Sequence, residues 1–551
     1  MHRTGKANRE KALGVKHCRF IRQIMSKKSK KPTNTISLTY TPTSTVKIRL
    51  TCKKQENSMA LQRHAAQTSI VCIILVLALA QNCFAAENVL EQYVNAPDDT
   101  FAYKLVRTYH DFLHTTYVLE ITSQEWFPDD VEPEKWKHWL RIIEPRLLGL
   151  LTQNIPFFSL VTSDTALLYL VRGDADHEDA PSGATFEEAE LALATRSIVA
   201  ELHGIPIGPV IFHDEDETSA LCLALKEWDP LDEYEDQCTV PRRENSLQAR
   251  SFDLALETED FTWALMAPMT KAAVRGMDVI QEFLQQRNWG MQIVSKFVLT
   301  GHSKRGHITW LAAALDDRVT AVAPVSYDLL NITDQIALQD TSWPARSPEL
   351  DANMEFDLYE RYKTTVGEQL IADLDPYYYR DRLTVPALIV VGTGDPYSCP
   401  DAANLYINEL TAPSRISYVP NTGHDIPELA EVESSIAQFY RHIINNQPLP
   451  DFTWSGLQQG SFTVTPGSQK PDSVRLWQAT NPENRDFRFF DDPAAPQWTP
   501  SDIVADANGA YAGTVQRPEA GYTAFYVELI YEDSVQEDSY SFATPLTVLG
   551  Q

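Results

Sequence analysis

The stretch SKFVLTGHSKRGHITWLAAAL, residues 295–315, combines an apolar run, a short turn and a helix-length segment. A serine on a tight turn between a strand and a helix exposes its hydroxyl, while the next amide and the helix dipole face developing negative charge. The usual form is G-x-S-x-G, but here Arg305 occupies the last glycine position and Gly306 follows it. We therefore predict a nucleophile at Ser303 and an oxyanion donor at the backbone N–H of Lys304. The alternative is an ordinary turn with a surface serine.

Two downstream residues stand where the partners of such a serine are expected. In an α/β-hydrolase the acid follows a later strand and the histidine follows the last strand. Asp395 ends the Gly-Thr-Gly turn after the apolar run at 387–391, and His424 follows the next strand-like run. His424 would take the proton of Ser303, and Asp395 would orient the imidazole. Asp401 remains an alternative acid, and His424 could instead be a loop histidine capping the final helix.

The region around this motif alternates between strand-like and helix-like segments from about residue 103 to residue 445. Short continuous apolar runs are typical of parallel strands that are covered on both faces, so we predict an α/β-hydrolase fold over residues 86–447. The first two strands have no helix between them and are expected to be antiparallel. The predicted strands are 116–123, 139–143, 165–171, 208–212, 295–300, 319–325, 387–391 and 415–419, and the predicted helices are 186–202, 270–286, 305–315, 401–410 and 428–445.

Two connections are too long for simple loops, near residues 213–262 and 327–384. Ligand sites in open α/β sheets lie beyond the carboxyl ends of the strands, so we predict that both insertions form a lid over the site. The second oxyanion donor is expected at Gly173, in the turn after the third strand. Arg305 would hold a substrate carboxylate or, more commonly for such a position, pair with a structural acid.

Residues 451–551 have a different pattern. Short alternating runs are separated by Gly, Pro, Asn and Asp clusters, with no helical period. This predicts a small β-sandwich of immunoglobulin or fibronectin type. The predicted strands are 461–465, 474–479, 510–515, 523–531 and 541–548.

Charge is distributed unevenly along the 551 residues, whose formal net charge is −28. Residues 1–58 carry 15 Lys and Arg against 2 acids, a net of +13, whereas residues 86–551 carry 31 against 73, a net of −42. A body this acidic repels nucleic acid and anionic membranes, so no nucleic-acid partner is expected. We interpret residues 1–58 as a basic leader that is disordered or absent from the native protein.

A signal peptide is predicted over residues 59–85. The apolar run at 70–80 follows Arg63 and ends before Ala85, with small residues at the positions that a signal peptidase requires. We therefore expect a secreted protein without stable membrane insertion; the alternative is an uncleaved signal anchor. Cleavage would leave three of the seven cysteines. Cys222 and Cys238 would then be able to form a disulfide in an oxidising compartment, and Cys399 would stay unpaired.

Metal and cofactor motifs are missing from the sequence. It contains no H-E-x-x-H, paired C-x-x-C, P-loop or G-x-G-x-x-G pattern. The acidic run His213-Asp214-Glu215-Asp216-Glu217 could hold Ca²⁺, although a solvated lid segment is the commoner meaning of such a run. We therefore expect no cofactor and no metal.

Eight segments between residues 88 and 548 resemble the PhoPQ-activated pathogenicity-related protein family, which also includes secreted repressors of cell proliferation. The resemblance implies an α/β-hydrolase domain followed by a β-sandwich, with Ser303, Asp395 and His424 as the triad. Arg172 stands where a second glycine is common in the family, so the resemblance does not settle which loop supplies the second oxyanion donor. The segments are 93–98 (YVNAPD), 121–126 (ITSQEW), 165–173 (TALLYLVRG), 301–306 (GHSKRG), 392–401 (GTGDPYSCPD), 420–424 (PNTGH), 475–488 (RLWQATNPENRDFR) and 521–531 (GYTAFYVELIY).

Two functions fit these observations. The first is a secreted serine hydrolase that cleaves an ester, amide or peptide bond through an acyl-enzyme. The second is a secreted signalling protein on a hydrolase scaffold, with a cell-surface receptor as its partner. The complete order Ser303, Asp395, His424 favours the enzyme, because a purely structural scaffold has no need of all three residues.

Overall fold

The computed structural model describes residues 34–39, 47–52, 88–147, 158–173, 180–215, 241–287, 293–426, 429–489, 495–533 and 538–550. The chain divides into two compact units, Met1–Ala86 and Glu87–Gln551. In the first unit, β1 (Asn34–Thr39) and β2 (Lys47–Cys52) pair antiparallel. The predicted signal peptide and the rest of the basic leader lie outside the described residues. Within the described ranges, no helix is long and apolar enough to span a membrane.

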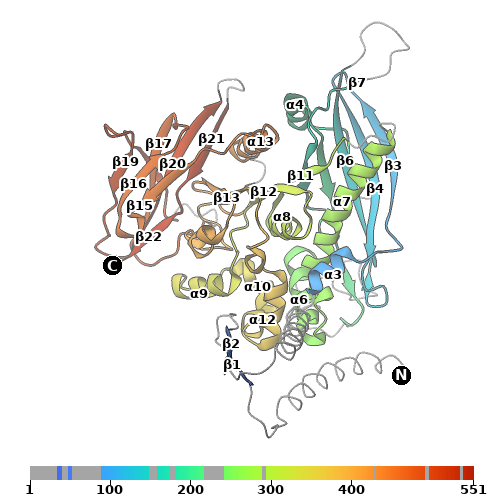
Figure 1. Cartoon of the computed structure of the whole chain (residues 1–551), viewed down its shortest axis with the longest axis horizontal. Helices are drawn as coiled ribbons and strands as arrows, with labels where there is room; N and C mark the ends of the chain where they lie inside the picture. Colours follow the sequence, from blue (N-terminus) through green and yellow to red (C-terminus); the bar gives the residue numbers. More distant parts are fainter. Residues whose placement is uncertain are drawn as a thin grey trace, which may run out of the picture. The chain divides into compact units, whose positions relative to one another are not determined.

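A mostly parallel sheet forms the centre of the second unit (Figure 1). It begins with antiparallel strands, as predicted, and continues with parallel strands through the motif at Ser303. This is the α/β-hydrolase fold expected from the sequence. In spatial order the strands are β3 (Ala102–His110), β4 (His114–Glu125), β6 (Lys135–Leu147), β9 (Val199–His203), β8 (Thr165–Leu170), β11 (Lys296–His302), β12 (Val319–Val325), β13 (Ala387–Gly392) and β14 (Ser414–Val419).

The segment predicted as one helix over 186–202 contains a helix and a strand. Helix α4 (Phe186–Thr195) ends where Arg196 adopts a left-handed conformation with φ 48°, and β9 begins at Val199. The β-branched residues Ile198 and Val199 favour the strand, and both are fully buried. The prediction over 208–212 was also wrong in extent, because only β10 (Ile211–Phe212) forms, and it pairs outside the central sheet with β5 (Val131–Glu132).

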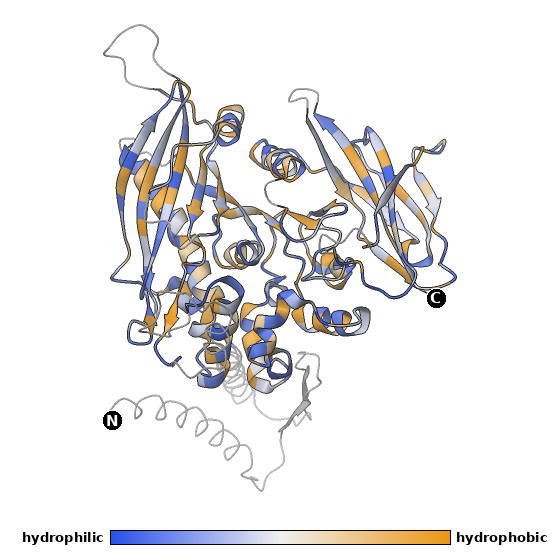
Figure 2. Ribbon diagram, turned by 180° about the vertical axis from the view of Figure 1, so that it is seen from behind, coloured by the Kyte–Doolittle hydropathy of each residue, from blue (hydrophilic) through white to orange (hydrophobic). Residues whose placement is uncertain are grey.

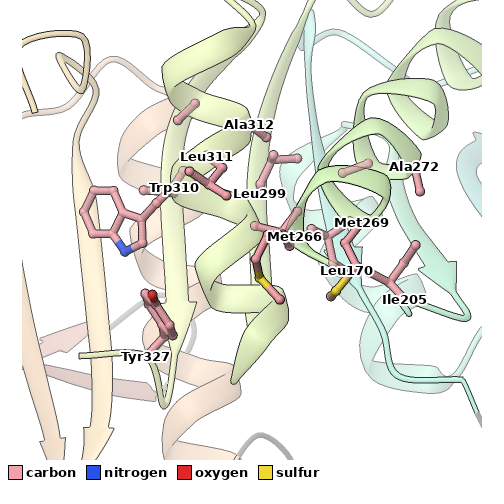
Figure 3. Close-up of a cluster of buried hydrophobic side chains, with 14 of the residues drawn as sticks. Leu170, Ile205, Met266, Met269, Ala272, Leu299, Trp310, Leu311, Ala312 and Tyr327 are labelled. Carbon is pink, nitrogen blue, oxygen red and sulfur yellow. The ribbon is translucent and has the colours of Figure 1, made fainter. Parts of the chain in front are cut away.

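Helices cover the central sheet on both faces. Helices α7 (Met266–Arg287) and α8 (Lys304–Leu315) pack on one face (Figure 3), with α3 (Val89–Asn95) against α7, and α4 and α13 (Ala430–Ile444) pack on the other face. Consecutive strand residues therefore bury their side chains in opposite cores, as Leu299 and Val298 do. The hydrophobic colouring along the central strands follows from this double burial (Figure 2).

The C-terminal region consists of antiparallel strands in two facing sheets. Phe462 and Phe525 stack between the sheets with their ring centroids 5.9 Å apart. One bridge, Ile416 to Ala543, joins the second sheet to the edge of the central sheet, so the boundary at residue 451 and the immunoglobulin or fibronectin type stay predictions. The run predicted as one strand over 541–548 is two strands. The first sheet contains β15 (Phe452–Ser455), β16 (Ser461–Pro466) and β19 (Tyr511–Thr514), and the second contains β17 (Ser473–Asn481), β18 (Thr499–Asp502), β20 (Tyr522–Asp533), β21 (Asp538–Ala543) and β22 (Thr547–Gly550).

The described parts of the two insertions form a helical cap. The first contributes α6 (Glu244–Thr258), and the second contributes four helices, of which α10, α11 and α12 pack against α6, while α9 packs against residues 402–405 (Figure 1). Residues 216–240 of the first insertion, including Cys222 and Cys238, lie outside the described residues, so their disulfide stays a prediction. The four helices are α9 (Ile332–Ser342), α10 (Asp351–Glu355), α11 (Leu358–Arg361) and α12 (Thr365–Leu374).

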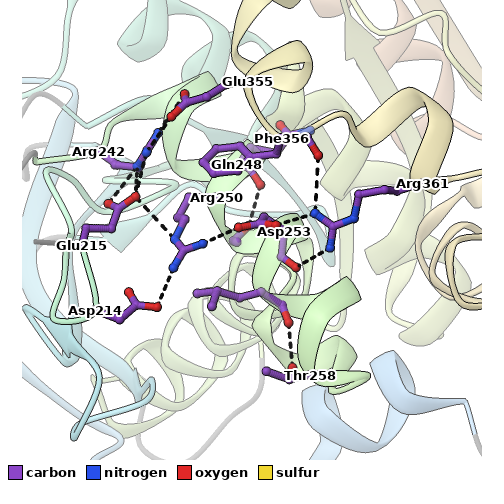
Figure 4. A network of polar contacts seen from close by, with 12 residues as sticks. Asp214, Glu215, Arg242, Gln248, Arg250, Asp253, Thr258, Glu355, Phe356 and Arg361 are labelled. Atoms are coloured by element: carbon purple, nitrogen blue, oxygen red, sulfur yellow. Dashed lines mark hydrogen bonds and ion pairs between the residues drawn. The ribbon is translucent and has the colours of Figure 1, made fainter. Parts of the chain in front are cut away.

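Ion pairs join the two insertions (Figure 4). Arg242 contacts Glu215 at 2.7 Å and Glu355 at 2.9 Å, and thereby bridges them. Arg250 forms an ion pair with Asp214, and Arg242 forms one with Glu215, the two acids of the acidic run that the structure describes. This part of the run therefore stabilises the cap. Among the described residues, no cluster of His, Cys, Asp or Glu is arranged to hold a metal ion. The network comprises Asp214, Glu215, Arg242, Arg250, Asp253, Glu355 and Arg361.

Substitution of Leu299 tests how much the packing of the central sheet beneath Ser303 contributes to the stability of the fold. Leu299→Ala removes a fully buried side chain and should lower the free energy of unfolding by about 2–5 kcal/mol, because the cavity is only partly refilled. Leu105→Ala is the matched control: it lies on β3 and is exposed, so its effect should stay within about 0.5 kcal/mol. Urea unfolding measures both. Equal effects of the two substitutions would contradict the assigned packing.

Candidate active site

Ser303 occupies a strained turn between β11 and α8. Its φ of 60° and ψ of −125° lie outside the regions that L-residues prefer, and its N–H donates to the Val325 carbonyl at 2.8 Å. The turn closes tightly, because a Cβ on Gly301 would lie 2.6 Å from the Arg305 Cβ. A Cβ on Gly306 would lie 2.9 Å from that of Tyr327. The glycine displaced by one position thus still serves close packing, here against the end of β12.

The structure brings together the three residues predicted from chain order. His424 Nε2 lies 2.9 Å from Ser303 Oγ, and His424 Nδ1 lies 2.8 Å from Asp395 Oδ2. The other oxygen of the buried Asp395 accepts the Tyr397 N–H at 2.8 Å. With Nδ1–H donating to the carboxylate, Nε2 is free to accept the serine proton. This geometry suits removal of a proton from Ser303 during nucleophilic attack.

Asp401, the alternative acid, has a different partner. Its side chain forms an ion pair with Arg485, which also donates to Ser342 Oγ. Burial raises the pKa of Asp401, and the charge of Arg485 opposes that rise. Asp401 therefore links the second insertion and the acid loop to the C-terminal region.

The backbone of His424 is fixed by two neighbouring side chains. Its carbonyl oxygen lies 2.8 Å from His302 Nε2 and accepts the Ser326 hydroxyl at 2.7 Å. Burial, followed by the nearby charge of His424, lowers the pKa of His302 to about 4. His302 is therefore neutral at physiological pH and can donate from Nε2 without adding charge. Sequence analysis missed this role, although His302 lies inside the motif that identified the serine.

The structure shows the surroundings of both predicted oxyanion donors, Lys304 and Gly173. Lys304 is the first residue of α8, so its N–H has no acceptor within the helix. This N–H lies at the N-terminal, positive end of the helix dipole. Gly173 follows β8, the strand beside β11, and a Cβ there would lie 2.5 Å from the Gly204 Cα. The loop at Gly173 therefore excludes a side chain. Donation from its N–H to a bound oxyanion stays a prediction.

Two cationic side chains of the motif bind one acid of the cap. Lys304 Nζ lies 2.7 Å from Glu244 Oε2 and 2.9 Å from Asn245 Oδ1, at the start of α6. The Arg305 guanidinium also pairs with Glu244 and donates to the Ile205 carbonyl. Arg305 thus has the structural acid that sequence analysis offered as one alternative.

A cavity of about 150 Å³ opens beside Ser303 and extends under the cap. Its outer walls come from α6, α9, α10, α11 and α12, so both insertions contribute. A cavity of about this size binds benzene in another protein, which sets the scale for the group that fits here. Apolar and aromatic side chains line much of it: Phe252, Tyr327, Leu329, Ile332, Ile336, Leu350, Tyr359, Tyr362, Leu370, Ile371 and Leu374.

Tyr397 joins the triad to both insertions. Its ring centroid lies 4.3 Å from that of His424, and its hydroxyl contacts Asn245 Nδ2 at 2.8 Å and Glu349 Oε2 at 3.1 Å. Sequence analysis did not single it out, although it lies in the Gly392–Asp401 segment. Cys399, nearby in the same segment, is a buried free thiol, and burial raises its pKa to about 12.

Comparisons with known proteins agree on the family of this chain. A family described as PhoPQ-activated pathogenicity-related protein matches residues 90–225 and 229–488. A curated relative, "Autocrine proliferation repressor protein A" of Dictyostelium discoideum, is 31% identical over 490 residues, covering 85% of this chain and 91% of the relative. These matches span both the described sheet and the segments that carry Ser303, Asp395 and His424.

Solved structures with similar folds are more distant. An acetyl xylan esterase from Paenibacillus sp. R4 is 13% identical with a TM-score of 0.39, covering 65% of this chain and 92% of that chain. A glucuronoyl esterase from Solibacter usitatus is 14% identical with a TM-score of 0.33, covering 64% and 90%.

His307, on the cavity wall, allows the site to be tested through the pH dependence of the protein's stability. Burial lowers its pKa to about 4, while its hydrogen bond to the Leu374 carbonyl, with Nε2 2.7 Å from the oxygen, acts against the shift. An unfolded histidine has a pKa of about 6.5, so between these values only the unfolded chain takes up the proton. The free energy of unfolding therefore decreases as the pH falls from about 6.5 to about 4.

His307→Gln removes this titration but retains an N–H donor. Between pH 6.5 and 4, the unfolding free energy of the wild type should fall more steeply than that of the variant, by about 1.4 kcal/mol per pH unit. Urea unfolding at several pH values measures the two slopes. Parallel profiles would mean that His307 is not held neutral in the folded protein.

Proposed function

This chain belongs to the PhoPQ-activated pathogenicity-related protein family, and we propose that it is a serine hydrolase acting on an ester, amide or peptide bond. The observation that supports the proposal most is the continuous hydrogen-bonded array from Ser303 through His424 to the buried Asp395. The strained turn that holds Ser303 adds to it, because backbone strain of this kind clusters at active sites.

The proposed reaction has two halves. In the first, His424 takes the proton of Ser303 as Oγ bonds to the substrate carbonyl carbon, and the resulting oxyanion faces the Lys304 N–H. The tetrahedral intermediate then collapses, its bond to the leaving group breaks, and His424 passes the proton to that group. In the second half, water loses a proton to His424 and attacks the acyl-enzyme, and Ser303 recovers its proton as the acid product leaves. Asp395 holds the imidazole in position and stabilises its protonated form throughout.

The cavity suggests the kind of acyl group. Its apolar and aromatic walls favour an apolar group next to Ser303. The signal sequence expected at residues 59–85 would bring the enzyme to substrates outside the cell. Secretion is part of the proposal.

A second candidate function comes from the curated relative. The name of "Autocrine proliferation repressor protein A" describes a signalling role for that protein. A similar role here would require a cell-surface receptor, and it could coexist with hydrolysis.

Labelling by a fluorophosphonate tests the proposed nucleophile. The secreted protein should be labelled at Ser303, with loss of labelling in Ser303→Ala, because the reagent needs an activated hydroxyl. Asp395→Asn should lower the labelling rate by about 10⁴-fold, since it fixes the wrong imidazole tautomer. Asp401→Asn is the matched control and should keep the wild-type rate to within a few-fold. Peptide mapping by mass spectrometry identifies the labelled residue.

Two results would contradict the hydrolase proposal. One is a folded wild type that remains unlabelled, and the other is equal labelling of the Asp395→Asn and wild-type proteins. A proliferation assay with conditioned medium addresses the second candidate: repression by both wild type and Ser303→Ala would support signalling that is independent of the nucleophile.

A further inference from the structure

One aromatic side chain lies against the histidine of the triad. The ring centroid of Tyr397 is 4.3 Å from that of His424, and the two ring planes are tilted by 48°. Both residues line the cavity that holds Ser303. Asp395 contacts the same two residues, because one of its oxygens binds the imidazole and the other accepts the Tyr397 N–H. Tyr397 is therefore in contact with two members of the triad.

Hydrogen bonds fix Tyr397 from several sides. Its hydroxyl accepts a hydrogen bond from Asn245 Nδ2 at 2.8 Å and donates to Glu349 Oε2 at 3.1 Å. Its carbonyl oxygen accepts a hydrogen bond from Gln339 Nε2 at 2.8 Å. These three partners belong to the two insertions that form the cap. The cap therefore holds the ring at the place where it meets the imidazole.

The proposed reaction puts a positive charge on His424. The imidazole takes the Ser303 proton during the attack, and its side chain is only 14% exposed, so water can solvate little of this charge. Asp395 opposes the charge from one side, with its Oδ2 2.8 Å from Nδ1. An aromatic ring attracts a cation that lies within about 6 Å of its centroid, and the attraction is stronger where water is excluded. The Tyr397 ring lies well within this range.

Other charged and titratable groups also surround His424 or line the same cavity. His302 is the nearest of them after Asp395, with its ring centroid 4.8 Å from that of His424, and it is neutral at physiological pH. None of these groups is changed in the variants below, so a difference between variants reports on Tyr397. The groups are His302, Lys304 and Arg305 on the strand-to-helix turn and α8, His307, Glu349 and Asp375 on the cavity wall, and Asp425 beside His424.

We infer that Tyr397 is a positioning residue of the triad, whose aromatic ring stabilises the protonated imidazole that forms when His424 accepts the Ser303 proton. This inference rests on the proposed hydrolase function and adds one side chain to its machinery. Tyr397 acts through His424, so its contribution does not depend on which substrate is bound.

Two substitutions separate the ring of Tyr397 from its hydroxyl. Tyr397→Phe keeps the ring and loses the hydrogen bonds to Asn245 and Glu349, whereas Tyr397→Leu loses the ring as well. Both variants keep the main-chain N–H that donates to Asp395. They release the same two cap residues, so the difference between them reports on the ring alone. Tyr397→Met, with a flexible side chain, replaces the leucine variant if thermal melting shows that variant to be unfolded.

The measured quantity is the rate of fluorophosphonate labelling at saturating reagent, followed across the pH range in which a histidine titrates. This rate reports on activation of Ser303 and requires no known substrate. Tyr397→Leu should label about 2- to 30-fold more slowly than Tyr397→Phe, the range that cation–π energies predict. The secreted full-length protein is used for every variant.

The pH profile distinguishes the charge effect from a loss of packing. In Tyr397→Leu the acidic limb of the profile should move to lower pH by about 0.4 to 1.5 units, because the protonated imidazole loses stabilisation and the neutral one does not. Tyr397→Phe should keep the limb at its wild-type position, because the ring remains.

Tyr359 supplies the matched control for enlargement of the cavity. It lines the same cavity, and its ring packs edge-on against Tyr362 with the centroids 6.3 Å apart. Tyr359→Leu removes the same volume as Tyr397→Leu and should leave the acidic limb in place. Thermal melting checks that each variant is folded.

The outcomes separate this inference from the function on which it rests. If Ser303 is labelled in the wild type but Tyr397→Leu and Tyr397→Phe share one rate and one profile, the role of the ring is wrong and the hydrolase proposal stands. A slower leucine variant whose limb stays in place, or an equal shift in Tyr359→Leu, likewise overturns it, since the ring would then serve only packing. If Ser303 of the folded wild type is not labelled at any pH, both proposals fail.

Discussion

The strained turn at Ser303 is the constraint on which the rest of the site depends. A residue with φ 60° and ψ −125° persists only when its surroundings enforce that conformation, and here a parallel strand, a buried helix and two tight glycine contacts do so. The same turn fixes three other features: the N–H of Lys304 at the start of α8, the hydroxyl near His424, and the Lys304 and Arg305 side chains against the cap. Strain, nucleophile position and charge thus come from one short stretch of sequence.

Much of this site could be predicted because the fold orders it along the chain. Parallel strands end at the same edge of a sheet, so an acid and a histidine at the ends of later strands necessarily approach a serine at the end of an earlier one. Asp395 was separable from Asp401 only in the structure, since both follow the same strand and their different partners, His424 and Arg485, are distant in sequence. The strand β9 was missed because its residues continue a helical pattern, and only burial on both faces reveals it.

The contacts between the cap and the site could not be predicted from the sequence. Glu244 and Lys304 are 60 residues apart, and Tyr397 and Asn245 are 152 apart, with no periodicity that links either pair. Ion pairs between the insertions, such as Arg242 with Glu215 and Glu355, hold the first turns of α6 where those contacts form (Figure 4). The cap is therefore part of the catalytic geometry that we propose, because Tyr397 touches His424 and Asp395 on one side and both insertions on the other.

Capture of a covalent intermediate tests the central claim most directly. The protein is mixed with an activated carboxylic ester, quenched in acid within one turnover, and digested for mass spectrometry. The account predicts that the acyl group is attached to the peptide containing Ser303, and that the adduct is lost in His424→Ala because the serine is no longer activated. Turnover of the ester without an adduct on Ser303, at a rate that Ser303→Ala leaves unchanged, would contradict it.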